Sequence, residues 1–303
     1  MGFRRGVASG QPGLCRLTIG VLFAVFASLL AGLAEAADED RATLSDKLPQ
    51  VALTRDGITA KLFMAYPEND ATLKAPKLEI SVEGKRVVEL FGEANGWETP
   101  QGTVGFYEID PTNNTPEIVF TSFSGGAHCC TQIYVMSTDA SGAWQTIDFG
   151  MYDGEGGDFS DIDGDGLVEM STYDNAFLYA FDCYACSTAP LMILTARSGQ
   201  RVDITREPKF AQAHRTRLSS MNEGLEAARA EFSPGFFAGW VAQKALLGEG
   251  YDAWETMKRA YRGYRDEGFE SCPTEKPNCS ESERGTYPFP TALTVFLKEQ
   301  GYL

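Results

Sequence analysis

Acidic residues alternate in residues 158–170, which read DFSDIDGDGLVEM. Asp161, Asp163 and Asp165 are separated by single residues, and Gly166 follows at once. Alternating carboxylates in a tight turn can direct three side chains at one point, and glycine permits the positive φ that makes such a turn sharp. Calcium is a hard cation that takes six to eight oxygen ligands at roughly 2.3–2.6 Å. The spacing therefore predicts a calcium site.

Two further ligands are expected from the rest of the loop. The carbonyl of Leu167 stands at the seventh position, and Glu169 at the ninth would bind the ion directly or through a water molecule. Magnesium fits less well because it resists full dehydration. The alternative is a solvated acidic turn without metal, but four carboxylates this close together repel one another unless a cation compensates them.

The loop differs from an EF-hand. Its twelfth position is Thr172, where an EF-hand carries a bidentate glutamate, and the segment VEMSTYD indicates a strand rather than an exiting helix. Residues 159–172, FSDIDGDGLVEMST, resemble the calcium loop of FG-GAP/VCBS-type repeats in integrin-like propellers and exported bacterial proteins. The resemblance implies that calcium is bound by the loop carboxylates, which are those of Asp161, Asp163, Asp165 and Glu169.

A weaker copy of the same pattern lies 53 residues earlier. Residues 106–120, FYEIDPTNNTPEIVF, place Asp110 where the later loop has Asp163, and Glu117 where it has Glu169 after one inserted residue. The earlier loop offers Thr112 and Asn114 in place of acidic ligands. It is either a degenerate second repeat or a coincidence in a common strand–turn–strand unit. A complete propeller needs several blades, and the β-rich part of this chain is too short for seven.

Six cysteines follow the N-terminal segment, and an even number in an exported chain favours structural disulfides. Cys272 and Cys279 are expected to close a short loop. Because neighbours in a strand face opposite ways, Cys129 and Cys130 are each expected to pair with one of Cys183 and Cys186. Fifteen pairings of six cysteines exist, so this one is a hypothesis.

Two other chemistries remain open for the cysteines. The pair Cys183 and Cys186 could be redox-active, and His128 with the four clustered cysteines could hold a soft metal. In a strand, His128 and Cys129 point to opposite faces, which disfavours a nucleophile and base. His214, the other histidine, lies in a separate, helical part of the sequence.

The elements that must position these residues fall into two regions. Residues 37–205 contain short β-type runs separated by turns such as DPTNNTP and DASG, with a hairpin expected around Glu83 and Gly84. Residues 206–303 place apolar residues three and four apart, with a helix start at Ser233 and a last helix over about 291–299. The predicted class is α+β, with an antiparallel β-rich N-terminal domain followed by a mainly helical C-terminal region.

Residues 1–36 are typical of a cleaved secretory signal. Arg4, Arg5 and Arg16 precede an uncharged apolar run that ends in Ala34-Glu35-Ala36. An uncleaved membrane anchor is the alternative, since the run is nearly long enough to span a bilayer. We expect an exported protein, periplasmic or extracellular, with no stable membrane span after cleavage.

The net charge of −16 disfavours nucleic acid and anionic membranes as partners. The motifs of serine hydrolases, P-loop proteins, zinc proteases and dinucleotide-binding proteins are absent from the sequence. The sequence therefore predicts an exported, calcium-binding, disulfide-stabilised protein that binds a protein or glycan of the cell envelope without catalysis. The alternative is an extracytoplasmic enzyme, either a carboxylate-based hydrolase or a thiol oxidoreductase.

Overall fold

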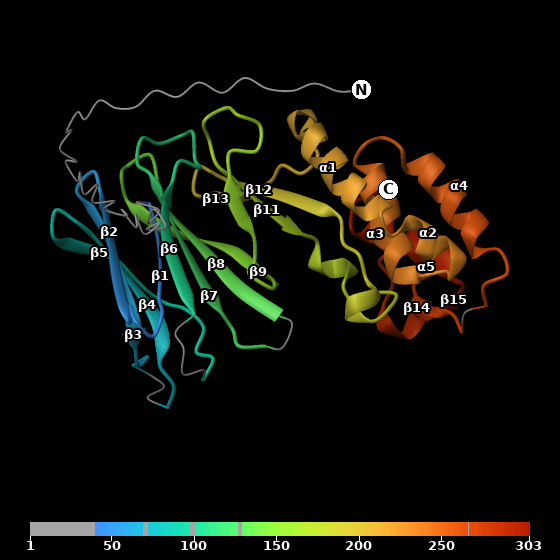
Figure 1. Ribbon diagram of the computed structural model, residues 1–303, viewed down its shortest axis with the longest axis horizontal. Coiled ribbons are helices and arrows are strands. Elements are labelled where there is room, and N and C mark those ends of the chain that lie inside the picture. Colours follow the sequence, from blue (N-terminus) through green and yellow to red (C-terminus); the bar gives the residue numbers. More distant parts are fainter. Residues whose placement is uncertain (1–39, 69–71, 97–100, 127–128, 266) are drawn as a thin grey trace, which may run out of the picture. The chain divides into compact units, whose positions relative to one another are not determined.

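The computed structural model describes residues 40–68, 72–96, 101–126, 129–265 and 267–303. The predicted signal segment 1–36 and His128 lie outside the described residues. Asp38–Leu303 form one compact unit, in which antiparallel sheets come first and helices follow (Figure 1). The α+β prediction is confirmed. No helix among the described residues is long and apolar enough to cross a membrane.

The first sheet is a four-stranded meander. It contains β2 (Gln50–Arg55), β3 (Ile58–Ala65), β4 (Ala75–Val82) and β5 (Lys85–Phe91), all antiparallel to their neighbours. The hairpin between β4 and β5 turns at Glu83 and Gly84, which have φ angles of 50° and 80°. Gly84 can adopt this left-handed conformation because it lacks a Cβ atom. The hairpin predicted here is confirmed.

The second sheet repeats this meander with one added strand. Its order is β1 (Arg41–Thr43), β6 (Gly102–Tyr107), β7 (Glu117–Phe123), β8 (Cys129–Thr138) and β9 (Trp144–Asp153). Successive residues of β7 enter different cores, since Ile118 and Phe120 pack towards the first sheet and Val119 towards the third. A strand alternates its side chains between the two faces. Both faces of β7 are therefore buried, as its nearly continuous apolar sequence requires.

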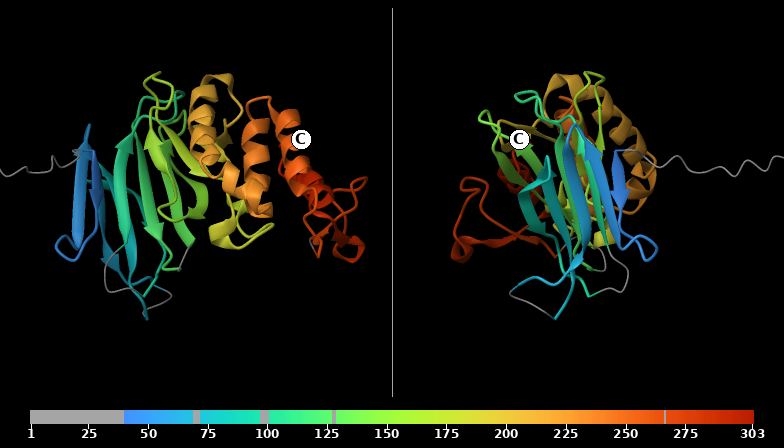
Figure 2. Two further views of the ribbon diagram at one scale, coloured as in Figure 1. Left: turned by 45° about the vertical axis from the view of Figure 1, so that its right-hand side comes forward. Right: turned by 90° about the vertical axis from the view of Figure 1, so that its left-hand side faces the viewer.

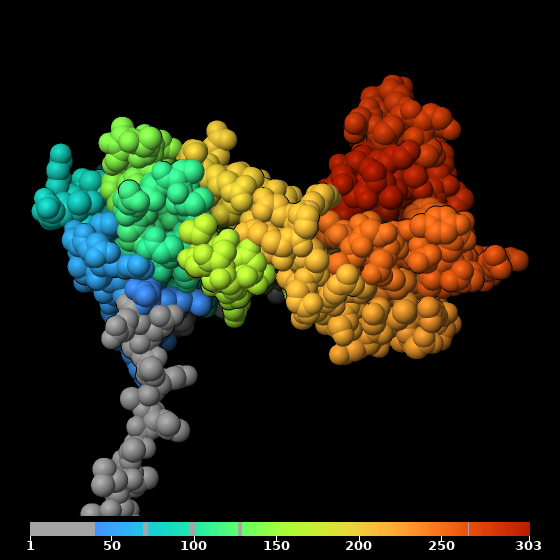
Figure 3. Space-filling view, turned by 90° about the horizontal axis from the view of Figure 1, so that it is seen from above, coloured from blue at the N-terminus to red at the C-terminus, as the bar shows by residue number. Residues whose placement is uncertain are grey.

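The third sheet is again a four-stranded meander. It contains β10 (Asp158–Ser160), β11 (Glu169–Tyr173), β12 (Leu191–Arg197) and β13 (Gln200–Asp203). Met170, Leu194 and Ala196 pack with Ile133 and Phe149 of the second sheet. In Figure 2 the three sheets follow one another with the sequence colours, and in Figure 3 the residues of the third sheet lie between the second sheet and the helices.

The helical region begins after a single 3-10 turn, η3 (Pro208–Phe210). It contains α1 (Ala211–Asn222), α2 (Leu225–Ala230), α3 (Pro234–Ala245), α4 (Gly250–Tyr261) and α5 (Phe289–Glu299). The Ser233 hydroxyl accepts the Phe236 N–H at 3.3 Å, which caps α3 as predicted. Phe237, Phe289 and Leu293 are fully buried in the core that these helices share.

A buried polar bridge joins the helices to the third sheet. The Gln243 side chain of α3 accepts the Leu191 N–H at 2.8 Å and donates to His214 Nδ1 at 3.1 Å. His214 Nε2 then lies 2.7 Å from the Thr205 carbonyl, so it is the nitrogen that carries the hydrogen. Burial lowers the pKa of His214, although the bond to Thr205 opposes this effect. The His214 ring is therefore neutral, and it links Gln243 of α3 to the Thr205 carbonyl.

A short two-stranded sheet, β14 (Phe269–Ser271) and β15 (Gly285–Tyr287), brackets the last pair of cysteines. Phe269 packs on Phe181 and Phe289, with ring centroids 5.3 and 5.8 Å away. This sheet was not predicted from the sequence, because each strand is only three residues long. It holds the Cys272–Cys279 loop against the helical core.

Candidate metal centre

The acidic loop connects β10 to β11, and Asp161 organises its backbone. One carboxylate oxygen of Asp161 accepts the N–H groups of Gly164 and Asp165, at 2.7 and 3.1 Å. Its other oxygen accepts the Gly166 N–H at 2.9 Å. Gly164 and Gly166 have φ angles of 81° and 91°, which a side chain would strain. The sequence DIDGDG thus folds around its first aspartate.

Asp163 and Asp165 each use one oxygen for the turn and present the other. Asp163 Oδ1 accepts the Asp165 N–H at 3.1 Å, and Asp165 Oδ1 accepts the Leu167 N–H at 2.9 Å. Carboxylate oxygens of Asp161, Asp163 and Glu169 all lie within 4.8 Å of one another. The structure therefore brings three of the four predicted acidic ligands to one point, with Asp165 beside them.

Glu169 closes the loop from the first position of β11. Its side chain is buried, and Oε2 accepts the Ile162 N–H at 3.0 Å. Burial raises the pKa of Glu169, although the Ile162 N–H lowers it. Oε1 stays directed at the centre of the loop, where a cation would stabilise the ionised form.

Lys209 of η3 supplies a cation that the sequence analysis missed. Its ammonium group pairs with Asp163, and lies 3.0 Å from Asp165 Oδ2 and 3.5 Å from Glu169 Oε1. Burial lowers the pKa of Lys209, but the hydrogen bonds to Asp163 and Asp165 outweigh it and raise the pKa overall. The pKa of Asp165 is lowered by the Leu167 N–H and then by Lys209.

This donor set fits a calcium ion in chemistry and charge. All side-chain donors are carboxylate oxygens, which hard cations prefer. One ammonium group pairs with three of the four carboxylates, so the loop keeps a surplus of negative charge. Lys209 touches the inward oxygens of Asp163, Asp165 and Glu169, so a calcium ion bound by these oxygens requires the ammonium group to move away.

The earlier loop, residues 108–117, has a similar backbone arrangement, but its closing glutamate has different hydrogen-bond partners. Glu117 is buried, and its Oε2 accepts the N–H groups of Ile109 and Asp110, at 2.7 and 3.0 Å. Its Oε1 accepts from the side chains of Asn113 and Ser137, both within 3.0 Å. Neutral donors thus satisfy Glu117 where the later loop uses Lys209. A metal would find no unsatisfied carboxylate oxygen on Glu117.

The two loops occupy equivalent places in their sheets. Tyr107 pairs with Glu117 at the end of the β6–β7 hairpin, and Ser160 pairs with Glu169 at the end of β10–β11. The closing glutamate bonds the N–H of an isoleucine in both, Ile109 and Ile162. The loops are also joined directly, because the Val168 N–H donates to the Glu108 carbonyl at 2.7 Å.

The cysteine pairing differs from the prediction. Cys129 bonds to Cys130, and Cys183 bonds to Cys186, so the expected bridges between these clusters are wrong. The Cys272–Cys279 bridge is present, with a Cα–Cα distance of 5.7 Å. Strand alternation does not apply to these cysteines, because Cys129 is the first residue of β8, and Cys183 precedes the 3-10 turn Tyr184–Cys186 that Cys186 ends.

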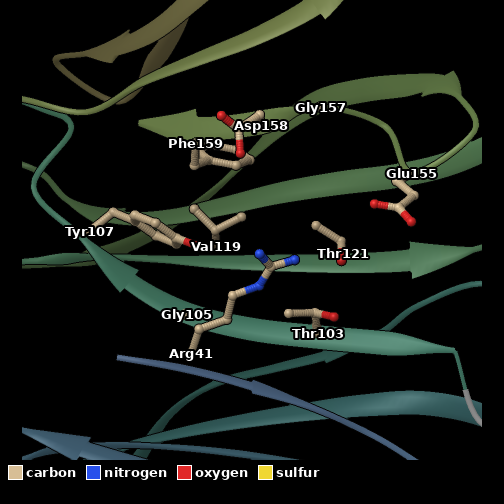
Figure 4. A pocket seen from close by; sticks show the side chains of 10 residues that line it. All are labelled: Arg41, Thr103, Gly105, Tyr107, Val119, Thr121, Glu155, Gly157, Asp158 and Phe159. Carbon is tan, nitrogen blue, oxygen red and sulfur yellow. The ribbon is translucent and has the colours of Figure 1, made fainter. Parts of the chain in front are cut away.

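A small cavity lies near β10 on the side of the second sheet (Figure 4). Arg41, Tyr107 and Thr121 project into it, and Phe159 lies on its opposite wall (Figure 4). Its volume is about 40 Å³, which is close to that of one water molecule. A ligand of metabolite size needs several hundred Å³. This cavity is therefore too small for a substrate.

Comparisons with known proteins place the chain in a family. The fold and site define an α+β protein with an acidic loop in its third sheet and a helical C-terminal region. Residues 214–301 match the family model described as the sll0997 C-terminal domain. The chain is 35% identical over 234 residues to the "Probable thylakoid lumen protein sll0997" of Synechocystis, covering 75% of this chain and 68% of that protein. The chain belongs to the sll0997 family.

A second relative is longer than this chain. The "Uncharacterized protein y4bJ" of Sinorhizobium fredii is 30% identical over 244 residues, and the match covers 77% of this chain but 38% of y4bJ. Among solved structures, an α-L-arabinofuranosidase of Fusarium graminearum aligns at 14% identity, covering 54% of this chain and 52% of that one. Its TM-score of 0.29 supports no statement about fold or function.

Proposed function

We propose that the chain is an exported, calcium-binding protein of the cell envelope, which acts by binding a protein or glycan rather than by catalysis. The observation that carries the calcium site is the meeting of Asp161, Asp163 and Glu169 oxygens in a loop whose carboxylates face only one ammonium group among the described residues. Export is supported by the relative named as a probable thylakoid lumen protein.

The acidic loop and its companion are proposed to be FG-GAP/VCBS-type repeats. Both loops close with a buried glutamate that bonds an isoleucine N–H. Each loop also opens a four-stranded antiparallel meander, which is the plan of a propeller blade. In this proposal the first repeat replaced its metal with Asn113 and Ser137, while the second kept an acidic centre.

The proposed role of calcium is structural. Lys209 lies in η3, immediately before α1, so the loop ties the third sheet to the start of the helices. An ion bound by Asp163 and Glu169 would hold the loop closed at the edge of the buried core.

The calcium site can be tested by titration and melting. Isothermal titration with calcium on metal-free protein should show one site, and calcium should raise the melting temperature relative to chelator, as ligand binding to the folded state requires. Asp163→Asn should abolish both effects. Asp252→Asn, on an exposed residue in the first turn of α4, is the matched control and should leave them unchanged. No heat of binding and equal melting temperatures would exclude the site.

The binding role needs a separate experiment. The mature protein with an affinity tag would be added to an envelope extract, with Asp163→Asn as the comparison. A discrete captured protein or glycan that is retained after a salt wash is expected. Hydrolysis of envelope glycans by the purified chain would instead favour the enzyme alternative.

A further inference from the structure

A separate pocket of about 410 Å³ opens where the two cysteine motifs approach each other. It is lined by Asp153 at the end of β9, Asn175 of η1 (Asn175–Phe177), Tyr179, Tyr184 of η2 (Tyr184–Cys186) and Cys129. Its volume is within the range of small-molecule sites. Neither the acidic loop nor Lys209 contributes to it.

Two tyrosines form an aromatic wall in this pocket. The ring centroids of Tyr179 and Tyr184 are 5.6 Å apart, with an angle of 38° between the ring planes. Tyr179 is 62% exposed, and among the described large hydrophobic residues only Tyr251 is more exposed. Its φ angle is +62°, a left-handed conformation that costs a non-glycine residue about 1 kcal/mol or more. The backbone thus holds an exposed ring in a strained position beside a second ring.

A carboxylate with an unused oxygen completes the pocket. Asp153 Oδ2 accepts a hydrogen bond from the Tyr184 hydroxyl. Asp153 Oδ1 is buried and has no hydrogen-bond partner in the part of the chain that the structure describes. The Asp153 N–H donates to Asn175 Oδ1 at 3.3 Å, and this bond holds Asp153 beside η1. A buried carboxylate oxygen without a partner is costly, so the Asp153 carboxylate in the wall of this pocket favours a ligand that carries a positive charge.

The charges of the pocket and of the chain favour a cationic ligand over an anionic one. None of the described lining residues is basic, and the chain carries a net charge of −16, which repels anions. Tyrosine faces attract cations through the ring quadrupole, most strongly when the cation is desolvated. Leu178 adds an aliphatic contact for methyl or methylene groups.

We propose that this pocket binds an organic cation, an ammonium group carried on a small apolar body. The ammonium group would lie beside the tyrosine rings and the Asp153 carboxylate, and its alkyl groups would contact Leu178 and Cys129. This proposal is independent of calcium binding, because it uses none of the loop residues.

Choline and its neutral isostere 3,3-dimethyl-1-butanol are the probes for this test, since they differ mainly in charge. Binding would be followed by titration calorimetry in the presence of a calcium chelator. Choline should bind at one site, and the isostere about tenfold or more weakly, as expected for a desolvated cation–aromatic contact. Asp153→Asn should weaken choline binding by about tenfold or more, because it removes the charge with little change of shape.

Three further variants separate binding in the pocket from the general attraction of a cation to an acidic protein. Tyr179→Asn should also weaken choline binding by about tenfold or more, because it removes one aromatic face, and asparagine tolerates the left-handed backbone. Asp252→Asn and Tyr251→Ala, on exposed α4, should bind choline like the unmodified chain. Circular dichroism would verify that each variant is folded. Equal affinities for choline and the isostere, binding of glucose in place of choline, or an unchanged affinity in both pocket variants would overturn the proposal.

Discussion

At the scale of single residues, Glu117 and Glu169 show how one framework supports two different sites. Both are buried, and both use Oε2 to bond the N–H of an isoleucine. Their Oε1 atoms differ, because Glu117 accepts from Asn113 and Ser137 while Glu169 faces Lys209. The glutamate side chain is the same in the two loops, so the residues around it determine whether a cation is needed.

Replacing each glutamate by glutamine should separate the calcium-independent role of Glu117 from the calcium-dependent role proposed for Glu169. Glu117→Gln puts an amide NH₂ against groups that already donate, so it should lower the free energy of unfolding by about 2 kcal/mol, with or without calcium. Glu169→Gln should reduce the stabilisation by calcium. Urea unfolding of both variants, with calcium and with chelator, would measure this. A calcium-dependent loss in Glu117→Gln would contradict the assignment.

Lys209 should compete with calcium for the loop. In Lys209→Met the ammonium group is gone while the aliphatic chain remains, so calcium no longer has to displace it. We expect calcium affinity to rise by about tenfold, and the metal-free protein to lose stability because four carboxylates then lack a counterion. Calorimetric titration checks the affinity, with Lys258→Met, on exposed α4, as the control. Weaker calcium binding in Lys209→Met would show that Lys209 supports the site.

At the scale of elements, the central sheet depends on strands that are buried on both faces. Phe120 is fully buried between the first and second sheets, so Phe120→Ala should lower the free energy of unfolding by about 3–5 kcal/mol. Val87 of the first sheet is 38% exposed, and Val87→Ala should cost less than about 1 kcal/mol. Chemical denaturation of both variants tests the difference. Similar losses would contradict the layered packing.

The link between α1, α3 and the third sheet should respond to pH. The lowered pKa of His214 means that, below about pH 6.5, the unfolded chain takes up a proton that the buried ring does not. The contribution of neutral His214 to the free energy of unfolding is therefore fully present above that pH and declines as the pH falls. Between pH 7.5 and 5.5 the chain should lose about 1 kcal/mol through this residue.

His214→Gln is the variant that isolates this effect. Glutamine cannot titrate in this range, so the difference in unfolding free energy between the two pH values should shrink by that amount. Urea denaturation at both pH values gives the comparison. If the chain and the variant lose the same free energy, His214 is not the source.

Local patterns predicted the elements well, and distant partners escaped prediction. The β4–β5 hairpin, the Ser233 cap and the fold class could be predicted because they depend on neighbouring residues. The acidic loop was also located, since its four acidic residues lie within nine residues of one another. Lys209 could not be predicted, because 40 residues separate it from Glu169 and only the packing of η3 brings them together. The pairing of Cys129, Cys130, Cys183 and Cys186 failed for the opposite reason, because their partners are only one and three residues away and local turns bring them together.

At the scale of the whole molecule, the disulfides stabilise segments rather than the arrangement of sheets. The bonded cysteines are one, three and seven residues apart in sequence. Short loops restrict the unfolded chain less than long ones do. Packing between the sheets must therefore provide most of the stability of the β-rich region.

Removing the last bridge tests this conclusion. The double substitution Cys272→Ser with Cys279→Ser should lower the free energy of unfolding by about 2 kcal/mol, the size expected for a closed loop of this length. The circular dichroism of the sheets should be unchanged below the transition. Thiol counting on the unmodified chain should find no free thiol among the six cysteines. Loss of sheet signal at room temperature would show that the bridge supports the entire fold.

The ammonium group of Lys209 has a consequence for the order of events in the life of the protein. Because it already pairs with Asp163 and Asp165, the acidic loop has a counterion as soon as η3 packs against the third sheet. The chain can therefore complete its fold in a compartment where calcium is scarce. In the proposed calcium site, metal binding would then exchange one cation for another on a finished scaffold, so calcium would strengthen a fold that forms without it.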